Sequence, residues 1–176
     1  MKLSPIVAGL MLLALTGAEA AESGIPLHQT PQPLPEIAFK DEQGAAVTPS
    51  AWRGKLVVLN VWATWCGPCR KEMPTLDRLQ GRLGGDRFDV VALSIDRAGA
   101  GVVRRFFDEI DIKNLKIFID ETGRASRDLK VFGLPATLLI GPDGRELGRL
   151  VGPAEWDTPE MIDFFETLIA KHQKGT

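Results

Sequence analysis

The chain has only two cysteines, and they stand three residues apart as Cys66 and Cys69. A run of apolar and β-branched residues over 56–62 leads into them, which is typical of a buried strand. Apolar residues at helical spacing lead away from them. This stretch predicts a strand, a tight turn that carries two thiols, and a helix whose first turn holds both. We expect most of the remaining chain to hold or present this unit.

Length and charge exclude several classes of protein. A chain of 176 residues favours one domain with a sizeable core. The formal net charge is −2 and there is no basic run, so neither a nucleic-acid partner nor an anionic membrane surface is indicated. Disulfide-stapled exported domains are small and use many cysteines, whereas this chain has a core and two cysteines. The pair is therefore not expected to serve stability.

The first 20 residues have the pattern of a secretory signal peptide. Lys2 precedes an apolar run over 6–15, and Ala18-Glu19-Ala20 gives a small-x-small cleavage pattern. The run is shorter than the roughly 20 apolar residues of a membrane span. We expect cleavage after Ala20 and a periplasmic mature protein, in a compartment that permits disulfides. An uncleaved membrane anchor is the alternative.

The remaining chain divides into a linker and one domain. Residues 21–35 contain four prolines and Gly24, which predicts a flexible linker. Residues 36–174 alternate strand and helix patterns and end in a hairpin and a helix. This order predicts an α/β domain that has a mixed central sheet with helices on both faces.

The expected elements begin with a small hairpin over 36–48, ahead of the core. Pro74 lies inside the helix that follows the cysteines and should kink it. Thr158 can cap the last helix, with Pro159 at its first position. The other expected strands cover 88–95, 116–120, 136–140 and 147–151, and the other expected helices cover 102–110 and 125–131.

A Cys-x-x-Cys pair is commonly used for zinc binding, for a structural disulfide or for redox exchange. Zinc needs about four ligands, and the only histidines, His28 and His172, are not spaced as a zinc module. A structural disulfide would close a loop of only two residues and gain little chain entropy. Redox exchange is therefore favoured, with no metal and no cofactor expected.

The redox interpretation assigns a role to each residue of the turn. Cys66 lies at a predicted helix N-terminus, which lowers the pKa of a thiol, so it should attack a partner disulfide. Cys69, one turn further in and more buried, should then attack Cys66 and release the reduced partner. Gly67 and Pro68 keep the turn tight, and Trp65 is expected to cover the site. The alternative for Trp65 is an ordinary half-buried aromatic residue.

The motif around the cysteines resembles the thioredoxin superfamily and, within it, the TlpA/ResA-like exported reductases. The matching features are W-C-G-P-C at 65–69, R-K-E-M-P at 70–74, and the hairpin before the core. The resemblance covers about residues 34–170. It implies a thioredoxin fold with an N-terminal β-hairpin and an inserted strand-helix unit, which we place within 88–120.

The resemblance also implies a cis-proline that faces the disulfide. Gly133-Leu134-Pro135 stands before a predicted strand and matches that position. The backbone of Leu134 would then hydrogen-bond an extended client segment, so Leu134 and Pro135 join Trp65 and the turn as candidate substrate-binding residues. From the sequence alone, Pro135 can also be a strand-initiating proline after a glycine turn.

Two further positions bear on proton transfer. Thioredoxin has a buried aspartate six residues before the first cysteine, where this chain has Asn60, which cannot exchange a proton. Glu72, one helical turn after Cys69, is the replacement candidate. In TlpA/ResA-like proteins the matching glutamate lies beside the buried thiol and helps it to lose its proton. From spacing alone, Glu72 would be a surface residue near a helix start.

The resemblance implies a periplasmic thiol-disulfide oxidoreductase that reduces disulfides of client proteins, such as apocytochrome c or copper-assembly proteins. A membrane-embedded thiol donor would keep Cys66 and Cys69 reduced. The Gly67-Pro68 dipeptide is the one found in thioredoxin, which favours reduction. We expect a monomer.

Two other functions stay open. A thiol peroxidase of the redoxin type would need a Pro-x-x-x-Thr/Ser-x-x-Cys pattern, and none precedes Cys66. A copper carrier could use the two thiolates, which suit Cu(I), but the sequence offers no well-placed histidine as a further ligand.

Overall fold

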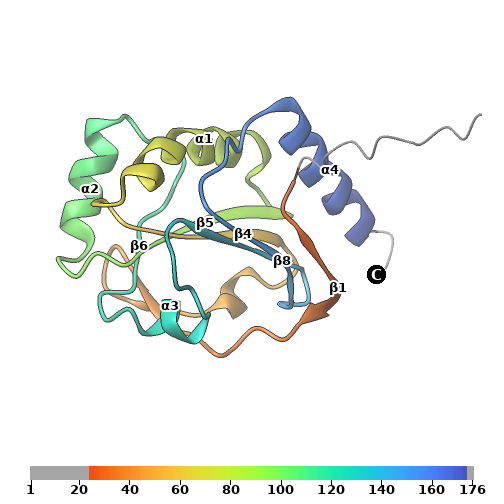
Figure 1. Cartoon of the computed structure of the whole chain (residues 1–176), viewed down its shortest axis with the longest axis horizontal. Helices are drawn as coiled ribbons and strands as arrows, with labels where there is room; N and C mark the ends of the chain where they lie inside the picture. Colours follow the sequence, from red (N-terminus) through yellow and green to blue (C-terminus); the bar gives the residue numbers. More distant parts are fainter. Residues whose placement is uncertain (1–23, 174–176) are drawn as a thin grey trace, which may run out of the picture.

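A computed structural model describes residues 24–173 as an α/β domain built on one eight-stranded sheet (Figure 1). The predicted class, a mixed central sheet with helices on both faces, is confirmed, whereas the predicted signal peptide lies outside the described residues. The strands are β1 (Leu27–Gln32), β2 (Phe39–Asp41), β3 (Ala46–Val47), β4 (Leu56–Trp62), β5 (Phe88–Ser94), β6 (Phe118–Ile119), β7 (Ala136–Ile140) and β8 (Glu146–Val151). The helices are η1 (Pro49–Trp52, 3₁₀), α1 (Gly67–Leu83), α2 (Ala100–Glu109), α3 (Arg124–Asp128) and α4 (Pro159–Gln173).

The sheet has the strand order β1-β8-β7-β4-β5-β6-β2-β3. Its centre is parallel, because β4 pairs with β5 and β5 pairs with β6 in the same direction. The strands β7, β8 and β1 extend it antiparallel on one side. The predicted N-terminal hairpin forms as β2 and β3, which extend the other side next to β6. Helix α2 and strand β6 lie between β5 and α3, within the range 88–120 where the inserted strand-helix unit is predicted.

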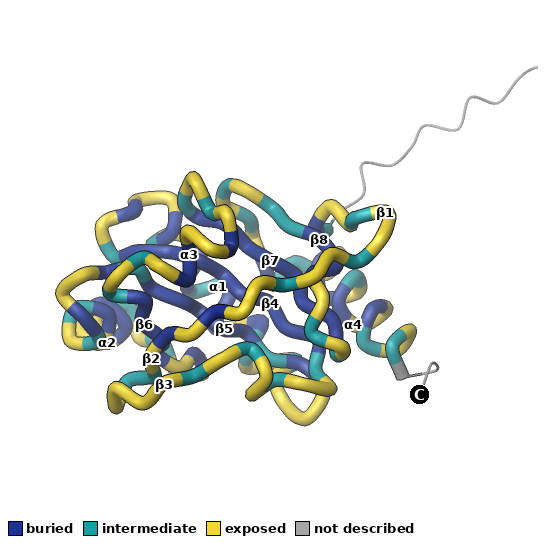
Figure 2. Tube along the Cα trace, turned by 90° about the horizontal axis from the view of Figure 1, so that it is seen from below, coloured by how far each residue is buried: buried dark blue, intermediate teal, exposed yellow. Residues whose placement is uncertain are grey.

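Strand β4 is the middle of the core, since all seven of its residues are buried. Leu56, Val58 and Trp62 point to the face that α1, α2 and α4 cover. The alternate residues Val57 and Leu59 point to the face that α3 covers. Figure 1 shows α1 and α4 above the sheet and α3 below it, and in Figure 2 the buried colour follows the central strands. A strand buried on both faces reads as a continuous apolar run, which explains why its bounds are predictable.

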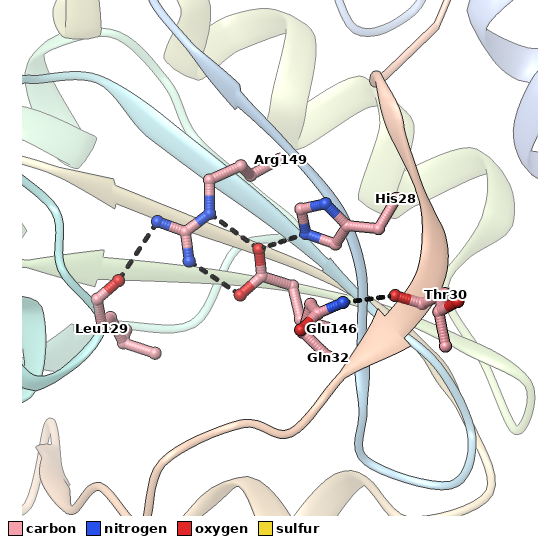
Figure 3. Close-up of polar contacts among 6 residues, drawn as sticks. All are labelled: His28, Thr30, Gln32, Leu129, Glu146 and Arg149. Carbon is pink, nitrogen blue, oxygen red and sulfur yellow. Dashed lines mark hydrogen bonds and ion pairs between the residues drawn. The ribbon is translucent and has the colours of Figure 1, made fainter.

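The predicted flexible linker over 21–35 is wrong at residues 27–32, which form edge strand β1 against β8. Prolines are tolerated there because an edge strand leaves one row of backbone groups unpaired. Gly148 of β8 permits the close approach, since a Cβ at this position would collide with the Pro26 carbonyl oxygen. His28 Nε2 lies 2.9 Å from Glu146 Oε1, and Arg149 donates to both Glu146 oxygens at 2.7 Å (Figure 3).

Smaller differences concern the ends of elements. Helix α3 spans 124–128 rather than the predicted 125–131, because Lys130 adopts a left-handed backbone with φ of 56°. Helix α1 continues through Pro74 to Leu83. The predicted cap of α4 is present, since the Met161 N–H donates to Thr158 Oγ1 at 3.2 Å. Within residues 24–173, no helix is both long and apolar enough to cross a bilayer.

Candidate active site

The two cysteines lie where central strand β4 passes into helix α1. They form a disulfide with their Cα atoms 5.2 Å apart. Cys66 is the N-cap of α1, and its sulfur accepts a hydrogen bond of 3.3 Å from the Cys69 backbone N–H. Cys66 is 7% exposed and Cys69 is fully buried. The predicted order of burial is therefore confirmed, and Cys66 is the one cysteine of the pair that solvent reaches.

The loop before β7 meets the cysteines at the same end of the sheet. Val61 of β4 pairs with Ala136 of β7, so the residue before Ala136 stands opposite the end of β4. The Leu134–Pro135 peptide bond is cis, as the resemblance implies. The Pro135 carbonyl oxygen accepts from the backbone N–H of Gly152, just after β8, at 2.9 Å.

Glu72 is buried, with 2% of its surface exposed, so the interpretation of this residue as a surface glutamate is wrong. It lies one turn after Cys69 on the face of α1 that packs on the sheet. Its Oε1 accepts from Asn60 Nδ2 at 2.8 Å. Its Oε2 accepts from Trp156 Nε1 at 3.0 Å and from the Ala154 backbone N–H at 3.1 Å. Three donors from two segments therefore hold one carboxyl group beside the first turn of α1.

Burial and hydrogen bonding act on Glu72 in opposite directions. Burial raises the pKa of its carboxyl group because the charged form loses its hydration. The donors on Trp156, Asn60 and Ala154 lower the pKa because they favour the charged form, but burial outweighs them and the net pKa is raised. A carboxyl group with a pKa raised by burial is a candidate for proton exchange with a neighbouring group.

Asn60 connects this carboxyl group to the loop of the cis-proline. Its Nδ2 also donates to Thr137 Oγ1 at 2.9 Å, and Thr137 stands two residues after Pro135 on β7. Its Oδ1 is buried and has no hydrogen-bond partner within the described part of the chain. Asn60 thus contacts Glu72, the predicted replacement for thioredoxin's buried aspartate.

Two aromatic side chains close to the site residues in sequence are exposed. Trp65 is 69% exposed, so it is not a half-buried aromatic residue, and it borders a groove with Arg97, Glu121 and Arg127. Phe132, in the loop before Pro135, is 92% exposed. We did not predict a role for Phe132 because the pattern around it reads as the end of a helix.

Helix α2 of the inserted unit packs beside the active-site helix. The guanidinium of Arg70, next to Cys69 in α1, lies 4.2 Å from the ring centre of Phe106 and 3.3 Å from Glu109. Trp62, at the end of β4, stacks on Phe107 with ring centres 5.6 Å apart. The insertion therefore supports both elements that carry the cysteines, a role for which its sequence gave no chemical signal.

Sequence reasoning also missed Trp156, Ala154 and Thr137, which complete the surroundings of Glu72 and Asn60. The available signal was slight: Trp156 is a tryptophan in a polar stretch just before the capped start of α4. Over residues 24–173, no group of three or more His, Cys, Asp or Glu side chains is placed to hold a metal ion.

The AhpC/TSA family model matches residues 30–145. The chain is 39% identical over 111 residues to the thiol:disulfide interchange protein CycY of Rhizobium leguminosarum, an alignment that covers 62% of this chain and 56% of CycY. It is 31% identical over 118 residues to the thiol-disulfide oxidoreductase ResA of Bacillus thuringiensis, covering 67% of each chain. The thioredoxin-like protein YneN of Bacillus subtilis is 33% identical over 150 residues, covering 78% of this chain and 84% of YneN.

Solved structures share the fold. A DsbE-like thiol:disulfide interchange protein of Chlorobium tepidum superposes with a TM-score of 0.66 at 28% identity, covering 81% of this chain and 96% of that one. A thioredoxin-like protein of Neisseria meningitidis gives 0.65 at 20% identity, covering 84% and 93%, which shows the fold alone. Together with the cysteine pair, these matches show that the chain belongs to the AhpC/TSA family, as a thiol-disulfide oxidoreductase of the ResA type.

Proposed function

We propose that the protein is a periplasmic reductase that transfers two electrons from Cys66 and Cys69 to a disulfide in a client protein. The observation that carries this proposal is the position of the pair. The partly exposed sulfur of Cys66 caps α1, while Cys69 is buried one turn before the buried carboxyl group of Glu72. This arrangement separates an attacking thiol from a resolving thiol and gives the resolving thiol an acceptor for its proton.

The first step belongs to Cys66. In the reduced protein, the backbone N–H of Cys69 and the other free amides at the start of α1 stabilise the Cys66 thiolate. This thiolate attacks one sulfur of the client disulfide. The bond between Cys66 and the client forms as the client's own disulfide breaks, and the released client thiolate takes a proton from solvent.

The second step belongs to Cys69 and Glu72. The Glu72 carboxylate accepts the proton of the Cys69 thiol, and the Cys69 thiolate attacks Cys66 Sγ. The Cys66–Cys69 disulfide forms, the mixed disulfide breaks, and the second client sulfur leaves as a thiolate. The client gains two electrons and the protein loses two. A membrane-embedded thiol donor then returns the pair to the reduced state.

The client is expected to bind as an extended segment along the loop of the cis-proline. The backbone of Leu134 would pair with it, and Pro135 presents no N–H to compete for the nearby sulfur. Gly67, Pro68 and Trp65 would contact the client from the other side of Cys66. The exposed side chain of Phe132 supports an apolar contact on this rim.

Export and client class are part of the proposal. The signal-like sequence over residues 1–20 supports a periplasmic location, and the relatives named CycY and ResA support disulfide-containing protein substrates. Apocytochrome c and copper-assembly proteins are the client classes that we would test first. Fractionation of cells would locate the protein, and recovery in the membrane fraction would favour an uncleaved anchor.

Trapping tests the reaction and identifies the client. Cys69→Ser leaves Cys66 able to attack but removes the resolving thiol, so it should accumulate a mixed disulfide with the client. The double variant Cys66→Ser/Cys69→Ser is the control and should trap nothing. The reduction potential of the pair tests the direction. A value near that of thioredoxin, about −270 mV, is expected, and one near that of the oxidant DsbA, about −120 mV, would overturn the assignment as a reductase.

A further inference from the structure

Trp156 reaches the active-site acid from a distant part of the chain. It lies in the loop between β8 and α4, 84 residues after Glu72, and is fully buried. Its indole Nε1–H donates to Glu72 Oε2 at 3.0 Å. Its own backbone N–H donates to Thr75 Oγ1 on α1 at 3.2 Å, which fixes the loop against the active-site helix.

The chain contains a natural comparison for this contact. Trp62 is also fully buried, yet its Nε1–H has no hydrogen-bond partner within the described residues. Buried tryptophans usually find a partner for this group. The fold thus tolerates one buried indole without a partner, while it directs the other at the carboxyl group beside the resolving cysteine.

The donors around Glu72 differ in what they can do when its carboxyl group gains a proton. An indole N–H and a backbone N–H can only donate, so Trp156 and Ala154 favour the ionised form. The Asn60 side chain can rotate its amide and offer Oδ1, which has no hydrogen-bond partner among the described residues, to a protonated Glu72. Asn60 can therefore serve both protonation states, whereas Trp156 and Ala154 select one.

No charged side chain among the described residues contacts this carboxyl group. The groups that donate to it are Asn60 from β4 and Trp156 with the Ala154 backbone from the β8–α4 loop, and Cys69 lies one turn earlier on the same helix. The charged neighbours of Trp156 in sequence lie elsewhere: Glu155 is exposed, and Asp157 pairs with Arg78. The neutral donors on Asn60, Trp156 and Ala154 therefore determine how far they offset the rise that burial causes in the pKa of Glu72.

We infer that Trp156 is a positioning residue for the redox reaction. Through its indole N–H it orients the Glu72 carboxyl group and holds it ready to take the proton of Cys69. This inference rests on the role of Glu72 in the proposed function. Loss of the indole N–H should make Glu72 retain its proton to higher pH, so that Cys69 resolves the mixed disulfide efficiently only in more alkaline solution.

The test replaces each buried tryptophan by phenylalanine. Trp156→Phe removes the N–H and keeps an aromatic ring, and Trp62→Phe makes the same change where the N–H has no partner. Two quantities are followed against pH: the ¹³C resonance of the Glu72 carboxyl carbon in the oxidised protein, and the single-turnover rate at which the mixed disulfide with a disulfide-containing peptide resolves. In Trp156→Phe, both midpoints should move to higher pH by about one pH unit, the size expected from losing one hydrogen bond to a charged group. In Trp62→Phe, neither midpoint should move.

A double variant separates positioning from general damage to the fold. The acid limb is the fall of the resolution rate at low pH that shares its midpoint with the Glu72 carboxyl group. Glu72→Gln should abolish this limb, and adding Trp156→Phe to Glu72→Gln should not change the pH profile further. If Glu72→Gln leaves that limb in place, the proposed role of Glu72 fails and this inference fails with it. If Glu72→Gln abolishes the limb but Trp156→Phe moves neither midpoint, only the inference about Trp156 fails.

The unmodified protein provides a second measurement if Trp156→Phe does not fold. The Nε1–H resonance of Trp156 should titrate with the same midpoint as the Glu72 carboxyl carbon, because its acceptor changes charge. The Nε1–H resonance of Trp62 should stay constant over that range. A Trp156 resonance that does not respond to pH would overturn the inference.

Discussion

Among single residues, Glu72 is a buried carboxyl group whose ionised form is costly for the fold but is the form that the proposed reaction uses. A buried carboxylate lacks hydration, and three neutral hydrogen bonds offset this only in part, so its pKa is raised. In the folded protein it therefore binds a proton at pH values where the same residue in the unfolded chain is already ionised. The protonated form stabilises the fold, and the ionised form is the one that the reaction requires.

This conflict predicts an unusual pH dependence of stability. The contribution of Glu72 is fully present below the pKa of an unfolded glutamate and is lost as pH rises through the raised pKa of the folded state, because the unfolded state binds fewer protons in that window. Glu72→Gln keeps a neutral hydrogen-bonding group and removes the titration. Urea unfolding at a series of pH values should show the free energy of unfolding falling with pH more steeply in the natural protein than in the variant. Parallel curves would contradict a raised pKa.

Residues of the site were predictable to different degrees. Cys66 and Cys69 could be found because their chemistry depends on local spacing. Asn60 and Glu72 could be found only because the resemblance to thioredoxin and to TlpA/ResA-like proteins marks their positions. The spacing could not show that these two side chains contact each other, since that depends on how α1 packs on β4. Trp156 was out of reach because its contact with Glu72 closes a separation of 84 residues.

At the scale of elements, strands β4 and β1 mark the two extremes of predictability. The bounds of β4 were predicted to the residue, because a strand buried on both faces is apolar along most of its length, here with Asn60 as its one polar residue. β1 was missed because it has no such pattern and contains Pro31. It is a strand only through its partner β8, and its side-chain contact between His28 and Glu146 spans 118 residues of sequence. The local sequence is therefore sufficient to predict β4 but not β1.

The attachment of β1 should weaken in acid. Burial alone would raise the pKa of Glu146, but hydrogen bonds and charges from Arg149 and His28 more than offset it, so the net pKa is lowered. A lowered folded pKa gives stability that is present above the pKa of an unfolded glutamate and is lost as pH falls through the folded value. Glu146→Gln should cost about 1–2 kcal/mol at neutral pH, since both partners are about one-third exposed.

Two measurements check this expectation. The cost of Glu146→Gln in the free energy of unfolding should shrink towards zero in acid, where the natural residue is protonated as well. Amide hydrogen exchange should accelerate in β1 of the variant while β4 stays protected, because β1 lies at the edge of the sheet. A cost that does not depend on pH would mean that the charge of Glu146 has no part in holding β1.

At the scale of the whole molecule, the redox site depends on the fold more than the fold depends on the site. The core consists of two apolar clusters, one on each face of the sheet, and the disulfide belongs to the edge of the cluster under α1, α2 and α4. The site gathers residues from β4, α1, β7 and the β8–α4 loop, and hydrogen bonds that do not involve sulfur connect them. We therefore expect the Cys66–Cys69 pair to be reduced and oxidised without a change in the rest of the fold.

This independence predicts that the protein folds without its disulfide. The bond closes a loop with only two residues between its ends, for which the loss of chain entropy in the unfolded state is worth about 1–2 kcal/mol. The variant Cys66→Ser/Cys69→Ser should therefore remain folded and cooperative, and less stable than the oxidised protein by about that amount in urea unfolding. The reduced natural protein is the matched control, since it has lost the same bond without a change of side chain. If the double variant and the reduced protein both failed to fold, the disulfide would be required for the structure. A catalytic cycle that breaks this bond at every turnover would then be contradicted.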